Sequence, residues 1–228
     1  MIANKKEFTG GVALLVLFFV VLYAMFQPMF DGRNAMGYLD HLYNTISKGS
    51  VYYIPDIKSD VEGLKGQDIA FSLGYGTEIE ATQSQSLFRE AGAMVERQGK
   101  TLNVKGALSA MLGAALSDAD LMYNNHGAAL TDKYDVEPRR ALFNWWTSLG
   151  LMDKELKKQG RFAASKVTST VLNKGVEMSY NYYEIEPVQI MDELGMVIFS
   201  LAFYVIYTLW YGFAILFVFE GWGLRLSH

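Results

Sequence analysis

The sequence predicts an all-α membrane protein in which two transmembrane helices flank a helical-bundle extracytoplasmic domain. Residues 8–30 and residues 194–219 contain no charged side chain. Each run exceeds the ~20 residues that a helix needs to cross a hydrocarbon core of ~30 Å. Residues 31–193 have the mixed composition of a water-soluble domain, and the four prolines lie where a helix would begin or break.

The composition limits the classes of function. The 228 residues suffice for one soluble domain and two spans. A net charge of −4 argues against a nucleic-acid partner, which usually binds a basic surface. The chain has no cysteine, which excludes a disulfide, a thiolate nucleophile and a thiolate metal site. It also lacks the common nucleotide-binding and catalytic motifs, so we expect neither a cofactor nor enzymatic activity.

The first predicted span has the features of an uncleaved signal anchor. Lys5 and Lys6 form a basic segment before it, but no small-residue cleavage site follows the apolar stretch. We therefore expect residues 8–30 to remain in the membrane as transmembrane helix 1, after a cytoplasmic tail of residues 1–7.

Charges beside the spans predict the orientation. Lys5 and Lys6 precede the first span and Arg225 follows the second. The charged residues just before the second span are all acidic: Glu184, Glu186, Asp192 and Glu193. The positive-inside rule then places both tails, 1–7 and 220–228, in the cytoplasm and residues 31–193 outside it. No N-x-[ST] sequon occurs, which favours a bacterial inner membrane and a periplasmic domain.

Helical periodicity predicts the first elements of the bundle. Apolar residues at three-to-four spacing predict a helix over residues 36–48. Residues 51–55 are expected to be extended, because the residue before Pro55 avoids the helical region. A long helix is expected over residues 67–98, ended by Gly99.

The remaining helices follow from caps and prolines. Asn103 is expected to cap a buried core helix over residues 104–123. Pro138 suits the first turn of a helix to about residue 159, and a further helix is expected over 162–183. Pro187 is expected to start a helix that continues unbroken through transmembrane helix 2, residues 194–219.

The second span carries a row of hydroxyl groups at helical spacing. These residues are Ser200, Tyr204, Tyr207, Thr208 and Tyr211. A hydroxyl that faces lipid lacks a hydrogen-bond partner, and the only hydroxyl groups of span one, Thr9 and Tyr23, lie near its opposite ends. The pattern therefore indicates a packing face for another membrane subunit or a second copy. The alternative is that Ser and Thr bond their own helix while the tyrosines extend toward the interface.

Three residues are weak candidates for a metal site: Asp118, Asp120 and His126. Carboxylates and an imidazole bind divalent ions, but residues two apart on a helix point to different faces. A solvated helix end is the favoured interpretation, and no metal is expected.

Two further groups of residues suit either binding or structure. A basic stretch could contact anionic headgroups or an acidic subunit, although such a run is usually solvated. It comprises Lys154, Lys157, Lys158, Arg161 and Lys166. The aromatic pairs could stack a ligand, but more often fill a core or a membrane interface. They are Tyr52-Tyr53, Trp145-Trp146 and Tyr182-Tyr183.

The leading hypothesis is a non-enzymatic inner-membrane accessory or scaffold subunit. Its expected partners are the lipid bilayer and other membrane subunits or further copies of itself, joined through transmembrane helix 2. The alternative is an extracytoplasmic ligand-sensing module that signals to a partner through that helix. An oligomeric ion-conducting protein and a metal-dependent enzyme are less favoured.

Overall fold

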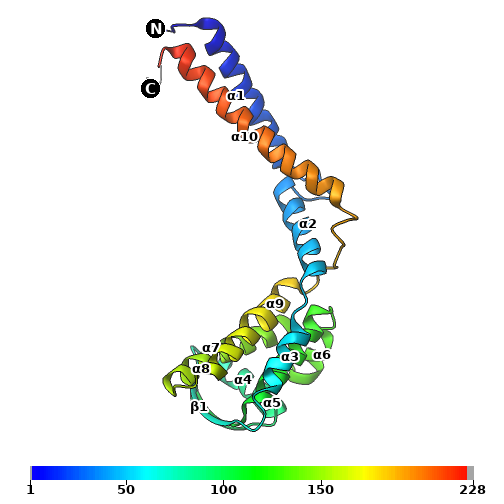
Figure 1. Cartoon of the computed structure of the whole chain (residues 1–228), viewed down its shortest axis with the longest axis vertical. Helices are drawn as coiled ribbons and strands as arrows, with labels where there is room; N and C mark the ends of the chain where they lie inside the picture. Colours follow the sequence, from blue (N-terminus) through cyan, green and yellow to red (C-terminus); the bar gives the residue numbers. More distant parts are fainter. Residues whose placement is uncertain (1, 225–228) are drawn as a thin grey trace. The chain divides into compact units, whose positions relative to one another are not determined.

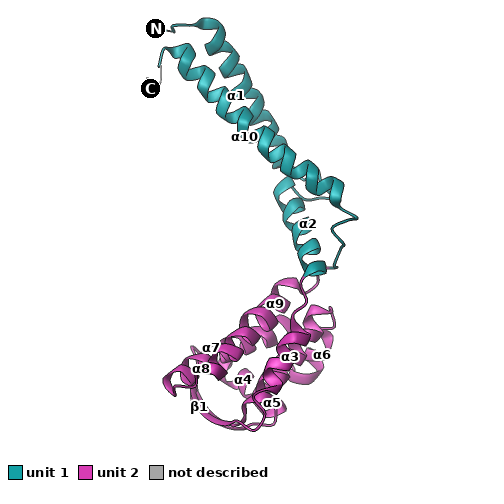
Figure 2. Cartoon of the chain, viewed as in Figure 1, with its two compact units in different colours: residues 1–50, 186–228 teal, residues 51–185 magenta. Residues whose placement is uncertain are grey.

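The computed structural model describes residues 2–224 and divides the chain into two units (Figure 2). Unit 1 comprises the described parts of residues 1–50 and 186–228, and unit 2 comprises residues 51–185. Arg225, which the orientation prediction uses, lies outside the described residues, as do the other residues of the predicted tail from 226 to 228. The structure is mostly helical, as predicted, but it also contains a small sheet.

Unit 1 is built from two long apolar helices and a shorter third (Figure 1). The long helices, α1 (Lys5–Met25) and α10 (Leu194–Trp222), lie side by side. Asn4 caps α1, because its side-chain oxygen accepts hydrogen bonds from the backbone of Lys6 and Glu7. By length and composition, both helices are able to cross a membrane.

A tight turn leads from α1 to α2 (Ala35–Ser50). Phe30 and Arg33 exchange backbone hydrogen bonds across Asp31 and Gly32, which both have positive φ angles. Asn34 then accepts a hydrogen bond of 2.8 Å from the backbone of Gly37 and starts the helix. The predicted helix over residues 36–48 is confirmed.

Unit 2 contains the sheet and the remaining helices. The strands are β1 (Asp68–Gly74), β2 (Met94–Gln98) and β3 (Thr101–Ala107), antiparallel in the order β1-β3-β2. The helices are α3 (Ile54–Glu62), α4 (Glu78–Glu90), α5 (Leu108–Tyr123), α6 (Ala128–Tyr134), α7 (Pro138–Lys158), α8 (Phe162–Thr170) and α9 (Met178–Tyr182), with a π-helix η1 (Val171–Glu177) between α8 and α9. The predicted extended segment over residues 51–55 is wrong from Tyr53 onward, because Tyr53 has helical dihedral angles, Ile54 begins α3 and Pro55 occupies its first turn.

The predicted long helix over residues 67–98 is wrong. Its first part is strand β1, in which buried residues Ile69, Phe71 and Leu73 alternate with exposed ones. Thr77 and Glu80 form a capping box that starts α4, and the final part is strand β2. The all-α class therefore needs correction by this three-stranded sheet.

The predicted cap at Asn103 is also wrong, because Asn103 lies within β3 and pairs with Ser72. The helix begins later, at Leu108, and forms the centre of the unit's core. Met111, Leu112 and Leu116 are fully buried there, which confirms the expectation of a buried core helix. The helix predicted from Pro138 is confirmed as α7, which packs Trp145 and Leu149 into the same core.

The predicted helix over residues 162–183 is confirmed as the continuous run α8, η1 and α9. The predicted unbroken helix from Pro187 is wrong, because α10 begins at Leu194. Backbone donors before it bond to other segments of the chain. The amide of Glu184 donates to the Asn125 side chain, and that of Val188 donates to the Thr45 carbonyl at 3.1 Å.

Candidate functional site

The two membrane-length helices approach each other closely where glycines face the partner helix. A Cβ atom added to Gly11 of α1 would lie 2.6 Å from the backbone nitrogen of Val218 on α10. A Cβ atom at Gly221 would likewise overlap the backbone of Phe8. Close backbone approach through small residues is typical of packed transmembrane helices. The helices α1 and α10 therefore form a tightly packed pair, here named the α1–α10 hairpin although the rest of the chain connects them.

Three of the five predicted hydroxyl residues find hydrogen-bond partners within the chain. Ser200 donates to the Val197 carbonyl and shares a bond of 2.8 Å with the hydroxyl of Tyr43 on α2. Thr208 donates to the carbonyl of Tyr204 in its own helix at 2.7 Å, which is the alternative interpretation of the row.

Tyr207 faces α1. Its hydroxyl donates to the backbone carbonyl of Phe18 at 3.2 Å, and the two rings stack at 4.3 Å between centroids. The prediction that span one alone cannot satisfy this row considered only its side-chain hydroxyls, whereas Tyr207 uses a backbone carbonyl of that span. Tyr211 packs against the same Phe18 ring at 4.9 Å.

Two contributors to this interface were not predicted from the sequence. Trp210 donates its indole N–H to the backbone carbonyl of Leu14 at 3.1 Å, and Tyr43 reaches Ser200 from α2. The position of Trp210, three residues after Tyr207 and thus on a neighbouring helical face, is a signal in the sequence that identifies it. The Tyr43 contact has no such local signal.

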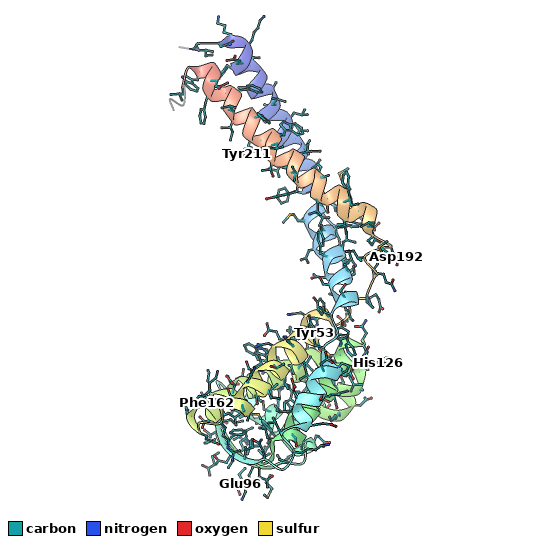
Figure 3. The ribbon with its side chains drawn as sticks, viewed as in Figure 1. Tyr53, Glu96, His126, Phe162, Asp192 and Tyr211 are labelled. Carbon is teal, nitrogen blue, oxygen red and sulfur yellow. The ribbon has the colours of Figure 1, made fainter. Side chains whose placement is uncertain are left out.

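Tyr204 and Tyr211 are the two members of the row whose hydroxyls form no hydrogen bond among residues 2–224. Tyr204 is the more exposed of the two, at 69% against 43%, and it lies nearer the middle of α10. A shallow groove of about 490 Å³ follows the same helix, lined only by apolar side chains. Its lining residues are Ile198, Leu201, Ala202, Val205 and Ile206. Figure 3 shows side chains projecting from α10 along its length, with Tyr211 labelled.

The weak metal candidates lie in unit 2 with separate partners. The carboxylate of Asp118 is buried and accepts bonds from Lys133 at 2.9 Å, the Tyr134 hydroxyl at 2.6 Å and the Trp145 indole at 2.7 Å. Asp120 pairs with Lys58 and accepts a bond from Tyr52. No group of three possible metal ligands occurs within residues 2–224.

His126, labelled in Figure 3, is exposed beyond the end of α5.

The Asp118 carboxylate affects the ionisation of Tyr134, whose hydroxyl it accepts a bond from. Burial, and then the charge of Asp118, raise the pKa of the Tyr134 phenol well above its usual value. This arrangement suits a structural cluster that joins α5, α6 and α7.

The aromatic pairs take part in packing. Trp145 is fully buried with its ring 5.6 Å from that of Phe88, and Trp146 donates to Glu177 at 3.0 Å. Tyr52 and Tyr182 both contact the ring of Tyr123, whose hydroxyl donates to the carbonyl of Val51.

A further pair of contacts lies near the end of unit 2. The Arg139 guanidinium lies over the ring of Tyr183 at 5.4 Å and pairs with Glu184 at 3.3 Å. These contacts join the start of α7 to the last residues of unit 2.

Comparison with protein-family models, with curated proteins and with solved structures finds no match to this chain.

Proposed function

We propose that this protein is a non-enzymatic accessory or scaffold subunit of a bacterial inner membrane. The α1–α10 hairpin spans the bilayer, both tails lie in the cytoplasm, and unit 2 is a periplasmic domain. The working surface in the membrane is the outward side of α10, which binds another membrane subunit or a second copy. The charge distribution beside the spans supports this orientation.

The observation that carries the proposal is the exposed hydroxyl of Tyr204. Tyr204 lies four residues, or about 6 Å, from the midpoint of α10 at Thr208. At that depth no water is available, so a hydroxyl without a partner carries a free-energy penalty. A hydrogen bond to a neighbouring subunit removes this penalty. The hydroxyls of Ser200, Tyr207 and Thr208 have partners in the chain and do not require one.

An apolar groove on α10 offers a further contact, and Tyr204 is not among its lining residues. Small Ala202 lies between larger aliphatic residues and permits a second helix to approach closely. Tyr204 lies two residues from Ala202 and thus on another side of the helix, so its hydrogen bond is a separate, directional contact. Measured interhelical hydrogen bonds in membranes average about 0.6 kcal/mol, so the bond selects the partner more than it drives association.

The test compares two tyrosines of the same helix. The chain is extracted in a mild detergent, the mass of the native complex is measured, and co-purifying proteins are identified. Tyr204→Phe removes the outward hydroxyl and is expected to reduce the association constant of the complex about threefold, as ~0.6 kcal/mol implies. Tyr207→Phe, the matched control, removes a bond inside the hairpin and is expected to leave the complex size unchanged.

A wild-type chain that elutes as a monomer with no partner overturns the scaffold proposal. If the complex is intact and Tyr204→Phe and Tyr207→Phe affect it equally, the assignment of the Tyr204 side of α10 as the binding surface is refuted, but the scaffold role is not.

A further inference from the structure

A groove on unit 2 gathers positive charge around an exposed aromatic ring. It has a volume of about 410 Å³ and lies along α8 and η1, with Lys157 contributed by α7. Three lysines line it, namely Lys157, Lys166 and Lys174, together with Phe162 and four uncharged polar residues: Ser165, Ser169, Thr170 and Asn173.

The groove follows from the helical period of α8 and η1. Phe162, Lys166, Ser169 and Asn173 are spaced by four, three and four residues and form one stripe. Asn173 donates to the Ser169 hydroxyl at 3.4 Å, which keeps the row continuous where the α-helix becomes a π-helix. Lys174 is held at one end with its ammonium 5.3 Å from the ring centre of Tyr53.

Most of the positive charge near the groove lacks a carboxylate partner. Asp153 pairs with Lys157 at 2.7 Å and also accepts a bond from Ser165, so it neutralises one lysine of the rim. Among the described residues, Lys166 and Lys174 form no ion pair, and neither does Lys154, which lies about one turn before Lys157 on α7. Arg161, just before Phe162, donates to the Asp68 carbonyl and retains its charge.

Phe162 determines the kind of ligand. Its side chain is 68% exposed at the start of α8, where Figure 3 labels it at the surface of unit 2. A single exposed aromatic residue is ordinary, but one surrounded by lysines is typical of proteins that bind a membrane surface. The ring enters the headgroup region while the ammonium groups attract anionic lipids. The lysines fit an acidic protein as well as an anionic bilayer, but the bilayer interface also accommodates the exposed aromatic ring.

We propose that this surface of unit 2, the Phe162 surface, binds the headgroups of an anionic phospholipid bilayer. Lys157, Lys166 and Lys174 contact the phosphates, and Phe162 inserts between them. This contact is separate from the anchoring of α1 and α10 and from the Tyr204 face, because it uses residues of unit 2 alone. It gives the soluble unit an attachment of its own to a lipid surface.

The experiment uses the full chain in nanodiscs of neutral phosphatidylcholine. Flotation measures its binding to added vesicles, either pure phosphatidylcholine or a mixture with about one-third phosphatidylglycerol. We expect binding to the anionic vesicles only. Each lysine near an anionic surface contributes about 1 kcal/mol, or about fivefold in affinity, so Lys166→Gln with Lys174→Gln is expected to weaken binding about 25-fold.

Matched variants distinguish the effect of the groove residues from the effect of a change in the protein's overall charge or hydrophobicity. Lys100→Gln with Lys105→Gln makes the same charge change at exposed positions of the sheet region and is expected to leave binding within about twofold. Phe162→Ser is expected to weaken binding, whereas Ile79→Ser, at a residue 67% exposed on α4, is not. Unchanged tryptophan fluorescence establishes that each variant is folded.

Equal binding to neutral and anionic vesicles overturns the proposal, as does equal weakening by the two lysine pairs. Inorganic phosphate is added at constant ionic strength in a second experiment. Displacement of the vesicles by phosphate shows that the groove recognises a free phosphate group rather than a bilayer, and this result overturns the proposal. Binding of poly-glutamate without binding of vesicles assigns the surface to an acidic protein and also overturns the proposal.

Discussion

The buried carboxylate of Asp118 supports the sharpest stability prediction, because a near-identical control lies two residues away. Asp118 and Asp120 both belong to α5, and each accepts a tyrosine hydroxyl and pairs with a lysine. Their burial differs: the side chain of Asp118 is 1% exposed and that of Asp120 is 25% exposed. Substitution to Asn changes the charge without changing the size of either side chain.

The magnitude follows from the donors that Asp118 satisfies. Hydrogen bonds to a charged group contribute about 1.5–3 kcal/mol each, and breaking a buried pair costs about 3–5 kcal/mol. Trp145 is fully buried and loses its charged acceptor, whereas the side chain of Lys133 is 33% exposed and reaches water. The amide oxygen of the substituted side chain still accepts one bond. We therefore expect Asp118→Asn to lower the free energy of unfolding by about 3 kcal/mol.

The assay is pulse proteolysis in urea, with the full chain in a nonionic detergent that preserves the α1–α10 hairpin. A urea dependence of roughly 1.5 kcal/mol per molar converts 3 kcal/mol into a midpoint shift of about 2 M. Asp120→Asn removes a partly exposed pair and is expected to cost less than about 1 kcal/mol. Equal shifts for the two variants would refute the structural role assigned to Asp118.

Two further predictions concern the hairpin and alkaline pH. Gly11→Val places a branched side chain against the Val218 backbone. It is expected to destabilise the hairpin by about 1–3 kcal/mol, measured by SDS titration of mixed micelles. Gly10 has no neighbour within 4 Å of an added Cβ atom, so Gly10→Val is expected to leave the stability unchanged. Burial raises the pKa of the Tyr75 phenol to about 12, whereas in the unfolded chain it is about 10. The stability that the protonated phenol contributes is therefore fully present below pH 10. Above pH 10 it is lost at about 1.4 kcal/mol per pH unit, because the unfolded chain releases the proton first. Tyr75→Phe is therefore expected to show a shallower loss of stability between about pH 10 and pH 12, and identical slopes would count against this cause.

The elements predicted correctly are those whose signals are local. The uncharged runs identify α1 and α10, and Pro138 at the first turn identifies α7. The sheet was missed because Ile69 and Leu73 are four residues apart and fit a helix and a strand equally well. Only the burial of Phe71 between them distinguishes the two, and it depends on pairing with Val104, 33 residues later in the chain.

The candidate site shows the same division. The spacing of Ser200, Tyr204 and Tyr207 is visible in the sequence, but their acceptors are not. Tyr207 bonds a backbone carbonyl 189 residues away, and backbone acceptors have no side-chain signature. The partners of Asp118 likewise come from α6 and α7, so residue spacing on α5 alone gives no indication of its role.

The central claim is that α1 and α10 both cross the membrane and place unit 2 on the opposite side from the two tails. The absence of cysteine allows a direct measurement, because single cysteines introduced by Ile2→Cys, Lys65→Cys or Leu224→Cys can be labelled without background and leave Lys5 and Lys6 in place. A membrane-impermeant maleimide is applied to spheroplasts of cells that express each variant. We expect Lys65→Cys to be labelled before lysis and the other two only after it. Labelling of all three before lysis, or of Ile2→Cys and Leu224→Cys on opposite sides, would contradict the two-span topology.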